Sequence, residues 1–209
     1  TIRLLGLALE RLGDFHTAET RNAALFRALA AEHEVPTVLR PPGLSRWHDA
    51  ALVARHVYPS RWGWRARAGL NASRFHHYTR AIEPELQRWE GRYDLLFELQ
   101  TLFAPGTGFR NRRYVIYTDN ILPLTLRYFR DWAPLSRREQ RRWIELEGEV
   151  CRSAATVFAM SRFLRDSLIE DYGVSPNRVV AVGGGSNTLA ADLEGKSWDS
   201  QIALFVGIN

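Results

Sequence analysis

Short apolar runs alternate with longer amphipathic stretches along the chain. Runs of the length expected for buried strands occur at residues 2–9, 34–39, 93–99, 114–118, 155–160, 178–182 and 202–206. Apolar residues at helical spacing predict helices over 18–31, 45–57, 60–78 and 84–90, and two longer helices beginning after Ser136 and Ser161. Strands that alternate with helices predict an α/β fold: a Rossmann-like parallel sheet with helices on both faces.

Residues suited to helix ends support this division. Ser136 and Glu139 have the spacing of a capping box. Ser161 is expected to cap the following helix, and Gly173 suits the left-handed position at its end. Ser45 is expected to cap a helix whose apolar side carries Trp47, Leu52, Val53 and Val57.

Composition excludes several classes of protein. Of 209 residues, 45% are hydrophobic and 24% are charged, which is typical of a globular protein with a real core. The single cysteine, Cys151, excludes a disulfide framework and a multi-cysteine zinc site. No apolar run approaches the length of a membrane-spanning helix. We therefore expect a soluble, cytoplasmic protein.

The positive charge is concentrated in one segment. The chain has 28 basic and 23 acidic residues, a net charge of +5. Residues 36–80 carry eight arginines against one acid, Asp49, so their local charge is 8 − 1 = +7. Three of the seven tryptophans also lie there. Three interpretations are open. The segment is a solvated helical surface without a partner, it binds an anionic membrane surface or a lipid-linked acceptor, or it binds nucleic acid. No nucleic-acid-binding motif supports the last interpretation.

Several catalytic and binding motifs are absent. Gly13 alone follows the first strand where a dinucleotide-binding domain needs three glycines, and neither a Walker motif nor a Gly-x-Ser-x-Gly elbow occurs. His33 and Glu34 do not begin a His-Glu-x-x-His motif, and the adjacent His76 and His77 would point to different sides of a helix. We expect no metal site.

Ligands of parallel α/β sheets bind beyond the carboxyl ends of the strands. The residues that follow the predicted strands are therefore the candidates for a site. They are residues 13–16, Gln100, Asp119, Asn120, Ser161 and residues 183–187.

The last third of the chain carries a recognisable series of residues. Its members are Glu147, Arg152, Ala154, Ser161, residues 171–176, residues 179–182 and the turn 183–187. This series resembles the amino-terminal, acceptor-side domain of GT-B glycosyltransferases of the retaining, family 4 type. The likeness is strong over 139–188 and weaker over 93–130. At the turn 183–187, a glycine stands for the Asn and Asn187 for the Asp of the family's Asn-Gly-Val-Asp pattern.

The resemblance also implies a domain organisation. Residues 1–189 would form the acceptor-binding domain, with residues 36–90 as a helical basic insertion. Residues 190–209 would be an interdomain linker and the first strand of a carboxyl-terminal donor-binding domain, because 202–207 reads like that strand. We therefore expect the amino-terminal half of a longer protein, inactive by itself. The resemblance implies a nucleotide-sugar donor and no metal or other cofactor.

It further assigns roles to the candidates. Gly13, Asp14 and His16 would approach a donor phosphate, although an ordinary turn capped by Asp14 or Thr17 is the alternative. Asp119 is the candidate catalytic residue, which would orient an acceptor hydroxyl or balance charge at the anomeric carbon. Capping of the next turn is its alternative role.

The remaining candidates would bind substrate. They are Asn120, Ser161, Gly184, Gly185 and Asn187. Ser161 is first a helix cap whose helix faces the cleft, Glu147 is expected to be structural, and Cys151 is expected in the core.

Two functions remain in view at this stage. The first is a hexosyltransferase that transfers a sugar from a nucleotide-sugar donor to a sugar or lipid-linked acceptor, with the basic segment at a membrane surface. The second is a stand-alone α/β module whose basic patch binds anionic lipid or nucleic acid.

Overall fold

A six-stranded parallel sheet organises the molecule. The computed structural model describes residues 1–10, 15–16 and 20–184. In it the strands follow the order β2-β1-β3-β4-β5-β6, and every neighbouring pair is parallel. The strands are β1 (Leu4–Leu7), β2 (Val38–Leu39), β3 (Leu95–Leu99), β4 (Tyr114–Thr118), β5 (Thr156–Ala159) and β6 (Val179–Ala181). The α/β fold predicted from the sequence is therefore confirmed.

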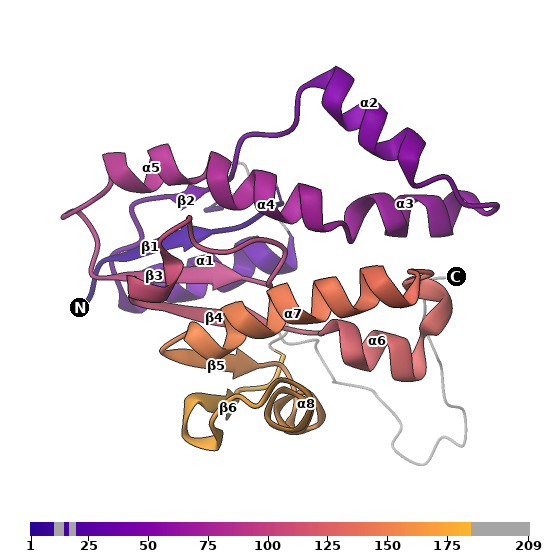
Figure 1. The fold of residues 1–209 in the computed structure, drawn as a ribbon. Coiled ribbons are helices and arrows are strands. Elements are labelled where there is room, and N and C mark those ends of the chain that lie inside the picture. Colours follow the sequence, from indigo (N-terminus) through magenta and orange to yellow (C-terminus); the bar gives the residue numbers. More distant parts are fainter. Residues whose placement is uncertain (11–14, 17–19, 185–209) are drawn as a thin grey trace, which may run out of the picture.

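Helices connect the strands (Figure 1). They are α1 (Arg21–Glu32), α2 (Arg46–Arg55), α3 (Arg61–Gly69), α4 (Ala72–Ala81), α5 (Glu83–Arg88), α6 (Leu122–Tyr128), α7 (Arg137–Ser153) and α8 (Arg162–Tyr172). Three short 3₁₀ helices, η1 (Phe109–Asn111), η2 (Arg130–Trp132) and η3 (Pro176–Arg178), complete the connections. Of the eight α-helices in the described residues, α2 to α5 lie between β2 and β3 in the chain.

The alternating side chains of the strands build two hydrophobic cores. On one face, Leu5, Leu96 and Ile116 pack among buried residues of α4 to α8. On the other face, Phe97 and Val115 join the buried residues of α1. Both faces of the sheet are therefore covered by helices, as a parallel sheet requires.

Gly6 lets α1 approach the sheet closely. A Cβ at this position would come within 2.7 Å of the Phe26 ring and 2.9 Å of Val38. Phe26 is fully buried and meets Phe97 edge to face at 5.8 Å between ring centroids. A side chain at position 6 would displace this packing.

An acidic residue of β3 lies inside the first core. Glu98 in β3 is completely buried, and none of the described residues donates a hydrogen bond to either carboxylate oxygen. Burial raises the pKa of Glu98 well above its usual value, because the charged form loses its hydration.

The helix ends predicted at Ser45, Ser136, Ser161 and Gly173 are confirmed. Ser136 and Glu139 form the reciprocal capping box of α7. The hydroxyls of Ser45 and Ser161 accept from the first turns of α2 and α8. Gly173 ends α8 in the left-handed conformation, with φ of 65°.

Two predictions about the basic segment are wrong. Residues 60–78 form two helices instead of one, because the chain turns at Leu70 and Asn71 begins α4 as its N-cap. The apolar side expected for α2 is not buried: Trp47 is 86% exposed and Val57 is 63% exposed. α2 buries no residue and stands away from the sheet (Figure 1).

The predicted strand at 202–206 and the linker before it lie outside the described residues, so they stay predictions.

Candidate functional site

A cavity of about 750 Å³ lies at the carboxyl edge of the sheet, beside the ends of β3, β4 and β5. This volume is in the range of sites for small organic ligands. Eighteen described residues line it: Leu70, Gln100, Thr101, Leu102, Asp119, Asn120, Ile121, Leu122, Leu124, Thr125, Tyr128, Phe129, Trp132, Trp143, Glu147, Ser161, Phe163 and Leu164. The sequence candidates Gln100, Asp119, Asn120 and Ser161 thus share one site.

Asp119 directly follows β4 and is held by an arginine. Its Oδ2 accepts a hydrogen bond of 2.8 Å from Nη2 of Arg21, in the first turn of α1. The Asp119 side chain is 27% exposed. The predicted alternative, capping of the next turn, is wrong for the following helix, because the N-cap of α6 is Ile121 and no side chain caps this helix.

Asn120 shapes the turn between β4 and α6. Its Nδ2 donates to Thr125 Oγ1 at 2.6 Å, and its carbonyl accepts from Thr118 Oγ1 at 2.8 Å. Both bonds fix the polar side of the cavity at the end of β4.

Ser161 serves as the N-cap of α8. Its hydroxyl accepts from the backbone N–H of Leu164 at 3.1 Å. The amino end of α8 also lines the cavity, and such an end favours a negative or electron-rich group.

Gln100 adopts the left-handed conformation at the end of β3, with φ of 65°. Its N–H still donates to the Tyr117 carbonyl at 2.8 Å, so the sheet ladder holds it in place. A non-glycine residue held in this region beside a cavity is typical of functional sites.

Glu147 of α7 joins three elements beneath the cavity. Oε1 accepts from Thr101 Oγ1 at 2.8 Å, and Oε2 accepts from the Leu122 N–H at 2.9 Å and from the Tyr172 hydroxyl. Burial raises the pKa of Glu147, and these hydrogen bonds oppose that rise. Its predicted structural role fits these bonds, although it also lines the cavity.

Four half-exposed aromatic side chains bound the cavity on the side of α6 and α8. Their exposed fractions run from 53% to 61%. We call this set the aromatic wall: Tyr128, Phe129, Trp132 and Phe163.

The donor-side candidates are separated from this cavity or lie outside the described residues. Gly13, Asp14, Gly185 and Asn187 belong to the latter group. His16 stacks beside Phe15 at 4.2 Å between ring centroids, and Gly184 packs against Met160. Neither His16 nor Gly184 lines the cavity.

Thr20 caps α1 with a hydroxyl that accepts from Ala23 at 3.2 Å. The predicted caps, Asp14 and Thr17, are therefore wrong for this helix.

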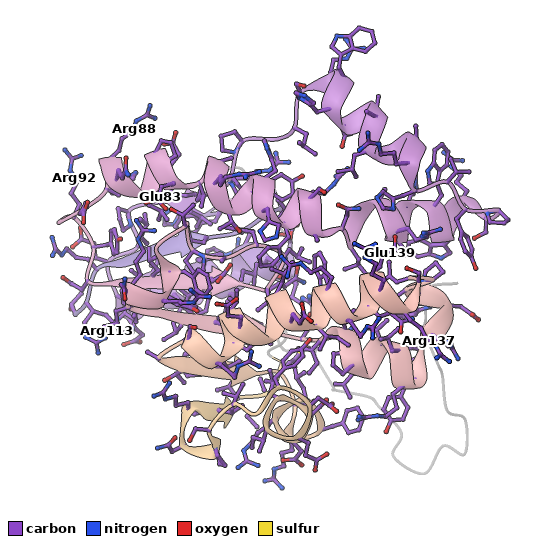
Figure 2. The ribbon with its side chains drawn as sticks, in the orientation of Figure 1. Glu83, Arg88, Arg92, Arg113, Arg137 and Glu139 are labelled. Atoms are coloured by element: carbon purple, nitrogen blue, oxygen red, sulfur yellow. The ribbon has the colours of Figure 1, made fainter. Side chains whose placement is uncertain are left out.

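A second surface carries the excess positive charge. Its residues are Arg46, Arg55, Arg61, Arg65, Trp47 and Trp62, all exposed, on α2 and α3; we call it the basic surface. In the same segment Arg67 pairs with Glu139 and Arg74 pairs with Asp49. Glu139 stands at the start of α7, on the side of α3 (Figure 2). The four arginines of the basic surface have no carboxylate partner among the described residues.

The described ranges hold no group of three His, Cys, Asp or Glu side chains arranged for a metal ion. Among the same residues, no helix combines the length and apolar character needed to cross a bilayer.

Comparison with known protein families identifies the family of this domain. The family model described as Glycosyltransferase Family 4 matches residues 18–188. The chain belongs to this family. Its fold is that of the amino-terminal domain of a GT-B glycosyltransferase. A search among curated proteins found no significant match.

The matched residues of this family 4 domain include the whole described cavity. A glycosyltransferase role, with a sugar donor and an acceptor as substrates, follows from membership of the family.

Sequence reasoning missed two parts of the site. Helix α6 and the aromatic wall were not predicted. No side chain caps α6, so Pro123 in its first turn is the local signal that could have indicated this helix. Arg21 is 98 residues from Asp119 in the chain, so only the fold brings the two together.

Proposed function

We propose that this domain binds the acceptor for transfer of a hexose-type sugar from a nucleotide-sugar donor. The observation that supports this most directly is the cavity at the carboxyl edge of a family 4 domain, with Asp119 on its polar side. Ligands of open parallel sheets bind at this edge.

Asp119 is the residue proposed to act on the acceptor. A carboxylate there can accept a hydrogen bond from the attacking hydroxyl and balance positive charge at the anomeric carbon. Asn120 and the amino end of α8 at Ser161 would orient the acceptor beside it.

We infer that the donor is held mainly by a second Rossmann-like domain after residue 189. Residues 190–209 would link the two domains and supply the first strand of the second. Residues 13–16 and 184–187 would approach the donor diphosphate. Backbone N–H groups, helix amino ends and basic side chains such as Arg21 can neutralise that leaving group without a metal ion.

The experiment compares two forms of the protein. A panel of nucleotide sugars is incubated with the 209-residue chain and with the longer product of its coding sequence, and transfer is followed by mass spectrometry. We expect the longer product to transfer sugar. For the 209-residue chain we expect both sugar transfer and hydrolysis of the nucleotide sugar to stay near background. Normal transfer by the shorter chain would contradict the two-domain proposal.

We further propose that the basic surface contacts an anionic membrane. Exposed tryptophans beside arginines suit a bilayer interface, where the rings enter the headgroup region and the cations attract anionic lipid. Trp47 is 86% exposed and Trp62 is 76% exposed. Their flanking arginines have no carboxylate partner among the residues that the structure describes.

Sedimentation with vesicles tests this contact. Vesicles with and without anionic lipid are compared with a DNA oligonucleotide across a salt series. We expect binding to anionic vesicles that weakens in Trp47→Ala, Trp62→Ala and Arg61→Glu. Arg92→Glu and Arg113→Glu make the same charge change at the far end of the domain (Figure 2) and serve as controls. Tight, steeply salt-dependent DNA binding would favour a nucleic-acid module instead.

A further inference from the structure

We propose that the acceptor is amphipathic, with an apolar chain lying along the aromatic wall and its reactive hydroxyl directed to Asp119. This inference rests on the proposed function, because it names the acceptor class for the same cavity. It follows from how the cavity divides into a polar side and an apolar side.

Most polar side chains of the cavity lie at the strand ends; Thr125 of α6 and Glu147 of α7 are exceptions. Gln100 and Thr101 follow β3, Asp119 and Asn120 follow β4, and Ser161 follows β5. An acceptor hydroxyl would find hydrogen-bonding partners on this side.

The other side is largely apolar, although Tyr128 carries a hydroxyl and Trp132 an indole N–H. The aromatic wall consists of two ring pairs: Tyr128 meets Phe163 at 5.3 Å, and Phe129 stacks on Trp132 at 4.7 Å. Aliphatic side chains also line the cavity; they come from Leu70, Leu102, Ile121, Leu122, Leu124 and Leu164. Burying these half-exposed rings against an apolar ligand would remove a large apolar area from water.

This composition favours an alkyl or prenyl chain over a second sugar. A sugar ring stacks on an aromatic face but also needs partners for its hydroxyls, since unpaired polar groups are costly to bury. Helix α6, which carries Tyr128, also contributes Leu122 and Leu124 to the lining, and its Thr125 Oγ1 is already bonded to Asn120.

The aromatic wall also lies beside the helices of the basic surface. η2, which holds Trp132, packs against α3. Leu70, the C-cap of α3, is part of the cavity lining. Tyr58 and Arg67 share a smaller hollow with Arg130 and Asp131 of η2. A chain leaving the cavity here would emerge next to exposed tryptophans and unpaired arginines, where a bilayer can receive it.

Calorimetric titration with alkyl β-glucosides tests the proposal. Butyl, hexyl and octyl glucosides are titrated below their micelle concentrations into the 209-residue chain, with free glucose and a short oligosaccharide for comparison. We expect affinity to rise roughly threefold to fourfold per added methylene while the chain lies in the apolar part of the cavity.

Variants locate the chain within the cavity. Phe129→Ala and Trp132→Ala should weaken octyl glucoside binding at least fivefold and reduce the dependence on chain length, whereas Trp132→Phe should retain most of it. Val180→Ala truncates an exposed apolar residue outside the cavity and serves as the control. Circular dichroism confirms that each variant is folded, and a diazirine-tailed glucoside should label residues 128–132.

Three results would overturn the inference. They are affinity independent of chain length, tighter binding of the oligosaccharide than of octyl glucoside, and an unchanged chain-length dependence in Trp132→Ala. Failure of the proposed function is a separate result, because absent sugar transfer by the longer protein leaves these binding measurements intact.

Discussion

Arg21 and Asp119 join the first turn of α1 to the end of β4 through an ion pair of 2.8 Å. The pair places a guanidinium beside Asp119, which lines the cavity, and holds the carboxylate toward α1. Their side chains are 50% and 27% exposed, so both remain accessible to a bound substrate.

Replacement of Asp119 by Asn should separate activity from stability. In the two-domain protein proposed above, we expect turnover to fall about a hundredfold, as for other groups that act on a transferred proton. The free energy of unfolding should change by less than about 1 kcal/mol, because pairs this exposed contribute little. Initial rates and urea denaturation measure the two effects.

Asp166→Asn is the matched control for that substitution, since Asp166 forms an exposed pair with Arg165 on α8. Its turnover should match the unmodified protein. Near-normal turnover in Asp119→Asn would remove Asp119 from the catalytic assignment.

Glu98 should lower stability at neutral pH. Its buried carboxyl has a raised pKa in the folded protein. The protonated form is therefore tolerated below the unfolded-state pKa near 4.5, and stability is lost as pH rises from there through the folded-state pKa. We expect Glu98→Met to stabilise the fold by roughly 1–3 kcal/mol at about pH 8, and by less at about pH 5. Urea denaturation at both pH values measures this; a loss of stability at both would contradict it.

The Glu83 carboxylate should support stability above its unfolded pKa. Two hydrogen bonds from Arg112, of 2.9 and 2.5 Å, and two from Thr107 hold the pKa of Glu83 at about 2, against an ordinary value of 4.5. The stabilisation is therefore complete above about pH 5 and is lost as pH falls from 4.5 towards 2. Because the pair is partly exposed to solvent, we expect the ionised Glu83 carboxylate to contribute about 2 kcal/mol to the free energy of unfolding.

Glu83→Gln should flatten the acid limb of this pH profile, whereas Glu85→Gln, on the same helix, should preserve it. Urea denaturation in a series from neutral to acid pH makes the comparison. Parallel profiles for Glu83→Gln and the unmodified protein would show that the contacts with Arg112 contribute no pH-dependent stability.

Glu147 should be more sensitive than any exposed residue of α7. Glu147→Ala would leave the Thr101 hydroxyl, the Leu122 N–H and the Tyr172 hydroxyl without their acceptor, at a cost of about 3–5 kcal/mol. Glu147→Gln should cost less, because its amide oxygen still accepts. Thermal unfolding measures both, with the exposed Glu145→Gln as control; equal melting temperatures for all three would contradict the role.

Local signals in the sequence were sufficient for the helix ends and most strands. The capping box at Ser136 and the glycine at 173 provide hydrogen-bond partners or a backbone conformation for groups only a few residues away. Such local features can be predicted from the sequence. The predicted strand at 114–118 coincides with β4 for the same reason, since its apolar run is bounded by polar residues on both sides.

Features that depend on distant partners were not predicted. The apolar pattern of α2 gave no hint that Trp47 would remain exposed, because burial requires an opposing surface and none of the described residues supplies it. The helix predicted over 60–78 is divided at Leu70, where α3 ends and Asn71 caps the start of α4. The cavity itself needs α6, α7 and α8 together, and their mutual placement is a property of the fold.

The strand order has a consequence for how the chain folds. β1 pairs with β3 from Leu4 to Leu95, so 95 − 4 = 91 positions separate these partners in the sequence. During synthesis, β1 therefore cannot pair with β3 until α1 to α5 have been synthesised. Pairings across such spans close large loops and are slow to form. The sheet is expected to assemble late and slowly, and β1 is the segment most in need of protection from aggregation until then.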